Sequence, residues 1–211
     1  MVRVAIYGIA LLVIGFWVGH IWPVAAPVMG RATMDATVTQ MPARTETAVF
    51  GAGCFWGVEE SFREVPGVVA TAAGYSGGAL SYPSYKDVSF GNSTDHVEVV
   101  RVTFDPARIS YEQLLETFWA CHDPTIPQGA VEAARDRSAI FYASPEQAAI
   151  ANTSKVRHSA EYTKPIATVI RPATTFWRAE DYHQQYVEKN GGKKCRAPVG
   201  PKKVSASPGA S

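Results

Sequence analysis

Two hydrophobic periods alternate along the chain, and they predict short strands and amphipathic helices in turn. The strand-like segments are residues 48–51, 68–74, 96–104, 140–143 and 166–170. The alternation is sharpest in the third segment, where Val97, Val99, Val102 and Phe104 stand among polar residues. Residues 75–94 are instead rich in glycine, serine and tyrosine, a composition typical of a long loop.

Segments with helical periodicity separate these strands, at residues 55–63, 110–120, 144–158 and 181–189. Ser110 and Ser144 are suitable N-caps, and Pro145 suits the first helical position after Ser144. The glycines that follow Asn190 end the last helix. This order predicts an α+β fold: a two-layer sandwich with a central mixed or antiparallel sheet, flanking helices and a long coiled C-terminal segment.

Both ends of the chain depart from this pattern. We predict a signal anchor or signal peptide at residues 1–22, a flexible linker at 23–46, the folded domain at 47–199 and a disordered tail at 200–211. The apolar run from Val4 to Trp22 nearly reaches the length of an uncleaved anchor, which we favour. A cleaved signal peptide is the alternative, although Ala25-Ala26 makes a poor cleavage site. We therefore expect the domain at the periplasmic face, tethered to the inner membrane, or soluble in the periplasm after cleavage.

Composition and charge narrow the classes of function. Apolar residues make up 46% of the chain and the net charge is +1, which gives no reason to expect a nucleic-acid partner. The three cysteines, Cys54, Cys121 and Cys195, form no close pair, so neither a zinc site nor a thioredoxin-type motif is expected. We predict no metal and no cofactor, and we interpret Cys121 as a core residue of an apolar helix. An odd number of cysteines in an exported chain indicates a thiol kept for chemistry.

Cys54 stands where a strand runs through a glycine-flanked turn into a helix. Glycine allows the tight turn and leaves space for a ligand, and the free N–H groups of a helix start favour thiolate over thiol. Phe55 and Trp56 would form an apolar wall beside it. A buried structural cysteine among core aromatics is the alternative, because cysteine is among the most buried residue types. The whole string Gly51–Glu60 favours a nucleophile.

Several motifs in order resemble the A class of peptide methionine sulfoxide reductases, from about Thr47 to Cys195. They are Gly53-Cys54-Phe55-Trp56-Gly57, Gly74-Tyr75-Ser76-Gly77-Gly78, Tyr82-Pro83-Ser84-Tyr85, His96-Val97-Glu98, His122-Asp123-Pro124-Thr125, Arg137-Ser138-Ala139-Ile140 and Ala179-Glu180-Asp181-Tyr182-His183. The resemblance implies an enzyme that reduces the S-sulfoxide of methionine, free or in proteins, and so repairs oxidised proteins.

By this resemblance Cys54 is the nucleophile that attacks the sulfoxide sulfur and becomes a sulfenic acid. Glu98 matches the carboxylic acid that protonates the sulfoxide oxygen, a role that needs a raised pKa in an apolar pocket. From the strand pattern alone, Glu98 would instead face solvent. Cys195 matches a resolving cysteine that forms a disulfide with Cys54, and a thioredoxin-like dithiol would then regenerate the enzyme.

The resemblance also implies a substrate pocket. Tyr85 matches a tyrosine that hydrogen-bonds the sulfoxide oxygen, and we prefer it to the nearby Tyr82 because it stands better against Val88. Phe55 and Trp56 would cradle the substrate methyl group through sulfur–aromatic contacts. No partner beyond the oxidised substrate, the dithiol reductant and the membrane is implied, and we expect a monomer.

The loop at residues 126–138 departs from the family pattern and is about two residues shorter. The family's aspartate falls on Val131, although Glu132 could replace it after a one-residue slip. A second pocket tyrosine falls on Asp136, and nothing replaces it. Asp136 either brings a negative charge into the pocket or points outward. The surroundings of Cys195 also lack the family's aromatic residue.

Three hypotheses follow from the sequence. The first is a membrane-tethered reductase. The second is a module that binds methionine sulfoxide on the same fold with little or no turnover, because the altered loop has cost catalysis. The third is a general disulfide oxidoreductase that uses Cys54 and Cys195, which the absence of a CxxC motif disfavours.

Overall fold

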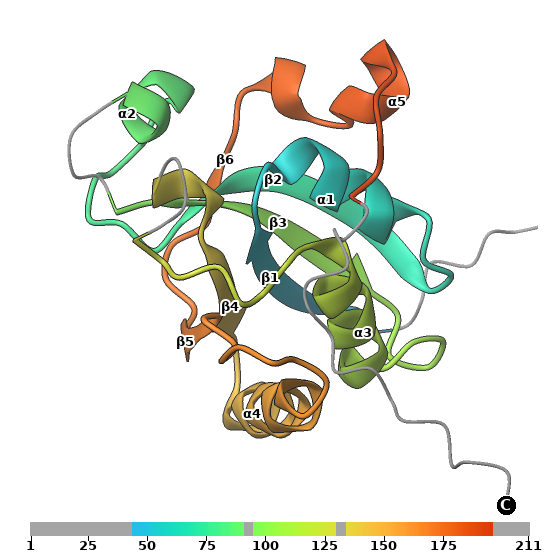
Figure 1. The fold of residues 1–211 in the computed structure, drawn as a ribbon. Coiled ribbons are helices and arrows are strands. Elements are labelled where there is room, and N and C mark those ends of the chain that lie inside the picture. Colours follow the sequence, from blue (N-terminus) through green and yellow to red (C-terminus); the bar gives the residue numbers. More distant parts are fainter. Residues whose placement is uncertain (1–43, 91–94, 130–133, 196–211) are drawn as a thin grey trace, which may run out of the picture. The chain divides into compact units, whose positions relative to one another are not determined.

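Six strands form one sheet in the order β5-β4-β1-β3-β2-β6 in the computed structural model of the protein (Figure 1). The structure describes residues 44–90, 95–129 and 134–195, which all belong to one unit, Met41–Ser211. Neighbouring strands are antiparallel except for β4 and β5, which run parallel. The strands are β1 (Glu46–Ala52), β2 (Val68–Ser76), β3 (Val97–Phe104), β4 (Ser138–Tyr142), β5 (Val169–Pro172) and β6 (Trp177–Arg178).

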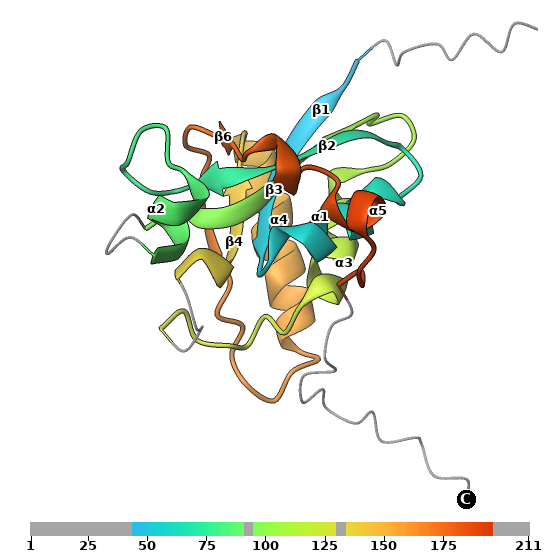
Figure 2. The same ribbon diagram turned by 90° about the horizontal axis from the view of Figure 1, so that it is seen from above.

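Three longer helices pack against this sheet, with α1 over β2 and β3, α3 over β1, and α4 over β4 and β5. The helix α3 lies between α1 and α4, so the three form one layer (Figures 1 and 2). The predicted α+β class with a mixed sheet and flanking helices is confirmed. The helices are α1 (Phe55–Arg63), α2 (Tyr85–Phe90), α3 (Tyr111–Cys121), α4 (Pro145–Ser159) and α5 (Tyr186–Asn190), with 3₁₀ turns η1 (Ala134–Asp136) and η2 (Asp181–His183).

The main core lies between the sheet and this helical layer. Phe50 of β1 stacks on Phe62 of α1 with ring centroids 5.1 Å apart, and it packs at a tilt against Phe118 of α3 at 5.4 Å. All three side chains are fully buried. Truncating one such ring costs about 3–5 kcal/mol because it removes buried apolar area and leaves a cavity. This core holds the start of α1, and therefore Cys54, against β1 and β3.

Strand β3 is buried on both faces, which the alternating pattern does not predict. Val97 and Val99 form a second small cluster with Ala139 and Phe141 on the far side of the sheet. Arg101 lies over the Phe176 ring on that side, 4.4 Å from its centroid. The alternate residues of β3 face the helical layer, and Glu98 is among them, so this carboxyl is buried rather than exposed to solvent.

The predicted helix ends are confirmed where capping decides them. The helix α1 covers the predicted residues, and Ser110 caps α3 in a reciprocal capping box with Gln113. Ser144 caps α4 by accepting a hydrogen bond from the Gln147 N–H. These ends depend on side chains within one turn of each terminus, and so the local sequence is enough to predict them.

The structure corrects three local predictions. The segment 75–94 is not one long loop, because β2 extends to Ser76 and α2 occupies Tyr85–Phe90. Ser84 starts α2 by accepting from the Asp87 N–H, while the Asp87 carboxylate accepts from the Ser84 N–H and hydroxyl. The predicted strand at 166–170 is shifted to Val169–Pro172. The short edge strand β6, which pairs with Gly74 and Tyr75, has no signal in the pattern.

The predicted helix at 181–189 is two pieces, η2 and α5, separated at Gln184 and Gln185. Gln185 has φ 54°, outside the helical region. The Gln184 side chain instead accepts from the Ala73 N–H and donates to the Ala73 carbonyl. The Gln185 N–H donates to the buried Glu59 carboxylate at 2.7 Å. These contacts with β2 and α1 replace the hydrogen bonds of a continuous helix.

The predicted N-terminal anchor or signal peptide, the linker up to residue 43 and the C-terminal tail lie outside the described residues. Across the described ranges, 44–90, 95–129 and 134–195, no helix is both long and apolar enough to span a membrane. Strand β1 begins at Glu46, whose Cα faces that of Phe104 in β3. The folded part of the chain therefore includes the last residue assigned to the linker.

Candidate active site

Cys54 lies at the junction of β1 and α1, as predicted. Gly53 has φ +86°, a conformation that favours glycine, and this turns the chain sharply after β1. Cys54 is the N-cap of α1 and is exposed. In the antiparallel pairing of β1 with β3, Phe50 lies opposite Val100, and the end of β1 therefore lies beside the first residues of β3. Sheet topology thus brings Cys54 close to Glu98.

The charge state of Cys54 differs from the sequence prediction. Packing around the thiol raises the pKa of Cys54, and the carboxylates of Glu98 and Asp136 raise it further. The N–H groups of Trp56 and Gly57 at the helix start lower it, as expected, but do not outweigh these effects. The resting site therefore favours the thiol, and ionisation of the sulfur depends on the charge of its neighbours.

Glu98 is only 3% exposed and is held at both carboxylate oxygens. The Phe55 N–H, on the residue after Cys54, donates to Oε2 at 3.1 Å, and Arg135 Nε lies 3.2 Å from Oε1. Burial raises the pKa of Glu98 to about 7, Asp136 also raises it, and Phe55 and Arg135 oppose the rise. The structure thus places a carboxyl that can hold a proton near neutral pH against the N–H of the residue that follows Cys54.

Tyr85, the first residue of α2, faces the same region. Its ring centroid lies 4.7 Å from that of His183, and its N–H donates to Glu180 Oε1 at 2.8 Å. Tyr82 is 84% exposed and packs on Trp177 at 4.5 Å instead. Of the two tyrosines, Tyr85 is the one that contacts the aromatic residues around Cys54.

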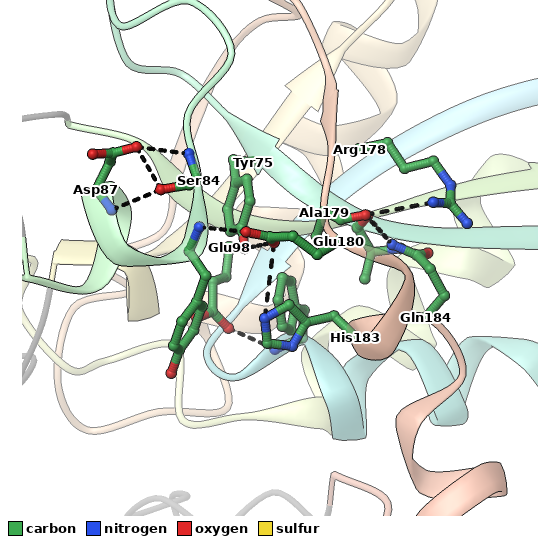
Figure 3. A network of polar contacts seen from close by, with 12 residues as sticks. Tyr75, Ser84, Asp87, Glu98, Arg178, Ala179, Glu180, His183 and Gln184 are labelled. Atoms are coloured by element: carbon green, nitrogen blue, oxygen red, sulfur yellow. Dashed lines mark hydrogen bonds and ion pairs between the residues drawn. The ribbon is translucent and has the colours of Figure 1, made fainter.

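A second carboxylate, Glu180, organises this side of the site (Figure 3). The Tyr75 hydroxyl donates to Glu180 Oε2 at 3.0 Å, and His183 Nε2 lies 3.9 Å from the same oxygen. Burial and the Glu180 charge raise the pKa of Tyr75, so its phenol stays protonated and can donate. Glu180 and His183 were not assigned roles from the sequence. The only sequence signal for a role of these two residues is that both belong to the Ala179–His183 motif.

The aromatic residues after Cys54 occupy different depths. Phe55 is 1% exposed and packs under the site, with its ring 5.0 Å from His183. Trp56 donates from Nε1 to His183 Nδ1 at 2.9 Å and stacks on Tyr186 with centroids 3.8 Å apart. His183 therefore fixes the orientation of Trp56, and Phe55 packs against the His183 ring.

A pocket of about 250 Å³ separates Cys54 from Cys195. The Cys195 N–H donates to the Gly57 carbonyl at 3.3 Å, which ties the chain after α5 to the first turn of α1. A Cβ at Gly57 would lie 3.0 Å from Cys195 Sγ, so glycine permits this close approach. The pocket is lined by Cys54, Trp56, Gly57, Tyr186, Val187, Gly191, Gly192, Lys193 and Cys195.

All three cysteines are free thiols, and Cys195 interacts with both of the others. A hydrogen bond with Cys121 and burial raise the pKa of Cys195, and the charge of Cys54 raises it further. Cys121 is 5% exposed and belongs to the main core, as predicted. The structure thus brings together Cys54 and the candidate resolving cysteine, which are far apart in sequence.

The altered loop is described only in part. Val131 and Glu132 lie outside the described residues. Asp136 is half-buried, with one oxygen 3.9 Å from Arg135 Nε, and its charge acts on both Cys54 and Glu98. Asp136 therefore does bring negative charge to the site. In the part of the chain that the structure describes, no cluster of three His, Cys, Asp or Glu side chains could hold a metal ion.

Comparisons with known proteins agree with this geometry. Residues 46–208 match the family model described as peptide methionine sulfoxide reductase. The chain is 56% identical over 155 residues to the peptide methionine sulfoxide reductase MsrA of Methanoculleus marisnigri, covering 72% of this chain and 94% of that protein.

Two solved structures of Mxr1 from Saccharomyces cerevisiae are similar to this one. The reduced form has a TM-score of 0.67 and 33% identity, covering 76% of this chain and 94% of that chain. The second is a complex with Trx2, with a TM-score of 0.50 and 25% identity, covering 72% of this chain and 91% of that chain.

Proposed function

The chain belongs to the peptide methionine sulfoxide reductase family, and from this membership we infer how its residues act. It is an enzyme that reduces methionine S-sulfoxide to methionine. The observation that carries our assignment is the Glu98 carboxyl, buried with a pKa of about 7 and bonded to the N–H that directly follows Cys54. This pairs a proton donor with a sulfur nucleophile.

In the first step, the Cys54 thiolate attacks the sulfoxide sulfur while the Glu98 proton passes to the sulfoxide oxygen. The S–S bond made by this attack and the sulfoxide S–O bond then break as the oxygen transfers to Cys54, which becomes a sulfenic acid, and methionine leaves with the electron pair that the thiolate supplied. Protonation is needed because oxide is a poor leaving group. The active pair holds one proton, on the carboxyl rather than the sulfur; the raised pKa of Glu98 favours this arrangement and the raised pKa of Cys54 opposes it, so the reactive pair is the minor form of the resting site.

Tyr85 and Trp56 orient the substrate. We assign the Tyr85 phenol as a hydrogen-bond donor to the sulfoxide oxygen, supported by its contacts with His183 and Glu180 at the site. Trp56, fixed by His183 and Tyr186, supplies the apolar surface for the methyl group, and the buried Phe55 packs against His183. Orientation by rigid groups lowers the barrier because the reacting atoms are already aligned.

In the second step, the Cys195 thiol attacks the Cys54 sulfenic sulfur, water leaves, and a disulfide joins the two residues. A dithiol reductant then attacks the disulfide and returns both thiols, while its own dithiol is oxidised. The complex of yeast Mxr1 with Trx2 supports a thioredoxin-like reductant for this chain. The pocket between Cys54 and Cys195 provides the space in which the disulfide forms.

The location of the enzyme is a further part of this proposal. The apolar run from Val4 to Trp22, preceded by Arg3, supports an N-terminal anchor that tethers the reductase at the periplasmic face of the inner membrane. Its substrates would then be oxidised exported proteins. Fractionation of cells, with protease added to intact spheroplasts, tests this location, because a domain on the cytoplasmic side would resist digestion.

A single-turnover assay tests the chemistry. The full chain is mixed without reductant with the separate R and S sulfoxides of a blocked methionine, and methionine formed and thiols lost are counted. We expect one methionine and two lost thiols per chain with the S form only. Cys54→Ser should form none. Cys195→Ser is the matched control: it should form one methionine but lose only one thiol, because Cys54 still becomes a sulfenic acid while the resolving thiol is gone.

The outcomes separate the hypotheses. Methionine from Cys54→Ser would refute the assigned nucleophile. Saturable binding of the S-sulfoxide with no methionine from the folded wild type would favour the binding module. Reduction of an unrelated protein disulfide as fast as the sulfoxide would favour the general oxidoreductase.

A further inference from the structure

Arg135 makes a contact that none of the assigned roles explains. Its guanidinium Nε lies 3.2 Å from Glu98 Oε1, while the other oxygen, Oε2, takes the Phe55 N–H. The Glu98 side chain is 3% exposed and the Arg135 side chain is 25% exposed, so this ion pair is largely removed from water. A charge pair so placed is screened much less than a surface pair.

Arg135 is held in this position by more than Glu98. Its Nη1 donates to the Ser89 carbonyl in α2 at 3.4 Å, and the Asp136 carboxylate lies 3.9 Å from Nε. The 3₁₀ turn η1 that carries Arg135 contacts both α2 and β3, and Figure 1 shows it on the side of the sheet where α2 lies. The guanidinium therefore bridges the segment after Tyr85, the altered loop and the candidate acid.

The altered loop adds a negative charge that the Arg135 guanidinium can offset. Asp136 stands where the resemblance expects a neutral phenol, and its charge opposes ionisation of both Cys54 and Glu98. When Glu98 gives its proton to the sulfoxide oxygen, the carboxylate left behind would face Asp136 in a buried site. An adjacent guanidinium offsets this repulsion through its ion pair with the Glu98 carboxylate.

We propose that Arg135 is a positioning residue of the reduction, which fixes the Glu98 carboxyl beside Cys54 and stabilises the carboxylate left after proton transfer. The proposal rests on the role of Glu98 given above. Arg135 does not replace the missing phenol as a substrate ligand. It acts through Glu98, and it compensates for the negative charge that Asp136 adds.

The groups that act on Glu98 come from each element packed around it. Arg135 and Asp136 face it from η1, Cys54 and the Phe55 N–H from the start of α1, and Tyr75 from β2. Tyr75 stays protonated, so it adds no charge below pH 10. Among these described groups Arg135 is the cation, and its removal should leave Glu98 a weaker acid that holds its proton to higher pH.

The test is a direct titration of the Glu98 carboxyl by difference infrared spectroscopy in the full chain. A Cys54→Ser background removes the coupled thiol titration, and the band lost in Glu98→Gln identifies the carboxyl. Arg135→Gln should raise the midpoint by about one pH unit, and Arg135→Lys should restore part of the shift. Asp136→Asn should lower the midpoint. Arg137→Gln is the matched control, because Arg137 lies two residues away and pairs with the exposed Asp95.

The same variants, with Cys54 present, are then assayed for single-turnover methionine formation against pH. We expect the break near pH 7 to move upward with Arg135→Gln and the rate below it to fall about tenfold. A Glu98 midpoint and a pH profile that both match wild type in folded Arg135→Gln would overturn the proposal. Full activity in Glu98→Gln would instead refute the assignment of Glu98 as the acid, whereas the infrared midpoints test the contact of Arg135 with Glu98 separately.

Discussion

Glu98 and Glu180 lie in one site but serve as an acid and as a hydrogen-bond acceptor, because their surroundings differ. Burial dominates at Glu98 and raises its pKa to about 7, which suits an acid. Burial also acts to raise the pKa of Glu180, but the N–H groups of Tyr85 and Glu180 and the Tyr75 phenol outweigh it and lower the pKa. Glu180 thus stays ionised as an acceptor that organises the pocket. Separation of two carboxyl pKa values by environment is a common basis for assigning acid and acceptor roles.

Glu98→Gln should lose activity and gain stability. Losing the proton donor should slow single-turnover methionine formation a hundredfold or more, roughly the contribution of a positioned acid. The folded protein keeps the Glu98 proton up to about pH 7, whereas the group's ordinary pKa is 4.5, so at pH 8 the buried carboxylate destabilises the fold. Denaturant unfolding at pH 8 should show a gain of about 1–2 kcal/mol. The gain should vanish at pH 4, and its persistence there would contradict this linkage.

At the scale of elements, the first turn of α1 serves both chemical steps. Its leading residue Cys54 faces Glu98, the next N–H holds the Glu98 carboxyl, and the Gly57 carbonyl binds the segment that carries Cys195. The capping position of Cys54 and the absence of a side chain at Gly57 are both visible in the sequence. The partners of these residues come from β3 and from beyond α5, and only packing brings them to this turn.

Gly57→Ala should separate the two steps. The new Cβ would lie 3.0 Å from Cys195 Sγ and must displace it. The first methionine should form at close to the wild-type rate, while loss of the second thiol should slow about tenfold or more, because a displacement of about 1 Å can cost a hundredfold. Quenched-flow thiol counting measures both. Gly129→Ala is the control, since nothing lies within 4 Å of its added Cβ. Equal slowing of both steps would indicate a general disruption of α1.

The link between α3 and β4 should make stability depend on pH. His122, after the end of α3, hydrogen-bonds to the Phe118 carbonyl and to Ser138 of β4, and burial lowers the pKa of His122 to about 4. Between pH 6.5 and 4 the unfolded chain binds a proton that the folded state does not, so stability falls as pH falls. His122→Gln should remove about 2–3 kcal/mol of this dependence. An unchanged slope of unfolding free energy in that window would show that His122 is not the group responsible.

At the scale of the whole molecule, the strand order assembles the site. Antiparallel pairing of β1 with β3 brings the end of one strand to the start of the next, and β2 lies beside β3 with Tyr75 facing Glu98. The chain then returns through β6 and η2 to place Glu180 and His183 over the same end of the sheet. Residues from four segments that are separate in the sequence thus meet at one site.

The reductase unit should be independent of the N-terminal segment. A chain beginning at Arg44 keeps all of β1, whose first paired residue is Glu46. It should fold and reduce a small blocked sulfoxide with the wild-type kcat/KM, because the described site uses no residue before Cys54. Full-length protein should partition with membranes and the shortened chain should not. Loss of activity on the small substrate would show that residues 1–43 contribute to the site.

The sequence by itself was enough to predict the helix α1 and its glycine-flanked Cys54, the caps at Ser110 and Ser144, and the α+β class. These features depend on contacts within a few residues, such as a serine accepting from an N–H three residues later. The family motifs added the roles of Cys54, Glu98 and Tyr85. The sequence of β3 also contains an indication that Glu98 is buried, because Glu98 lies on the same face of the strand as Val100 and Val102.

Only the tertiary structure decided what depends on partners far along the chain. Hydrogen bonds to Ala73 and Glu59 broke the last predicted helix. Burial of the Cys54 thiol, assisted by the Glu98 carboxylate, outweighed the N–H groups of the helix start and raised the pKa of Cys54. The contact of Arg135 with Glu98 joins residues from two segments that the sequence leaves unrelated. Local periodicity indicates the type of an element and which of its side chains are apolar, whereas burial and charge at a site depend on which elements pack together.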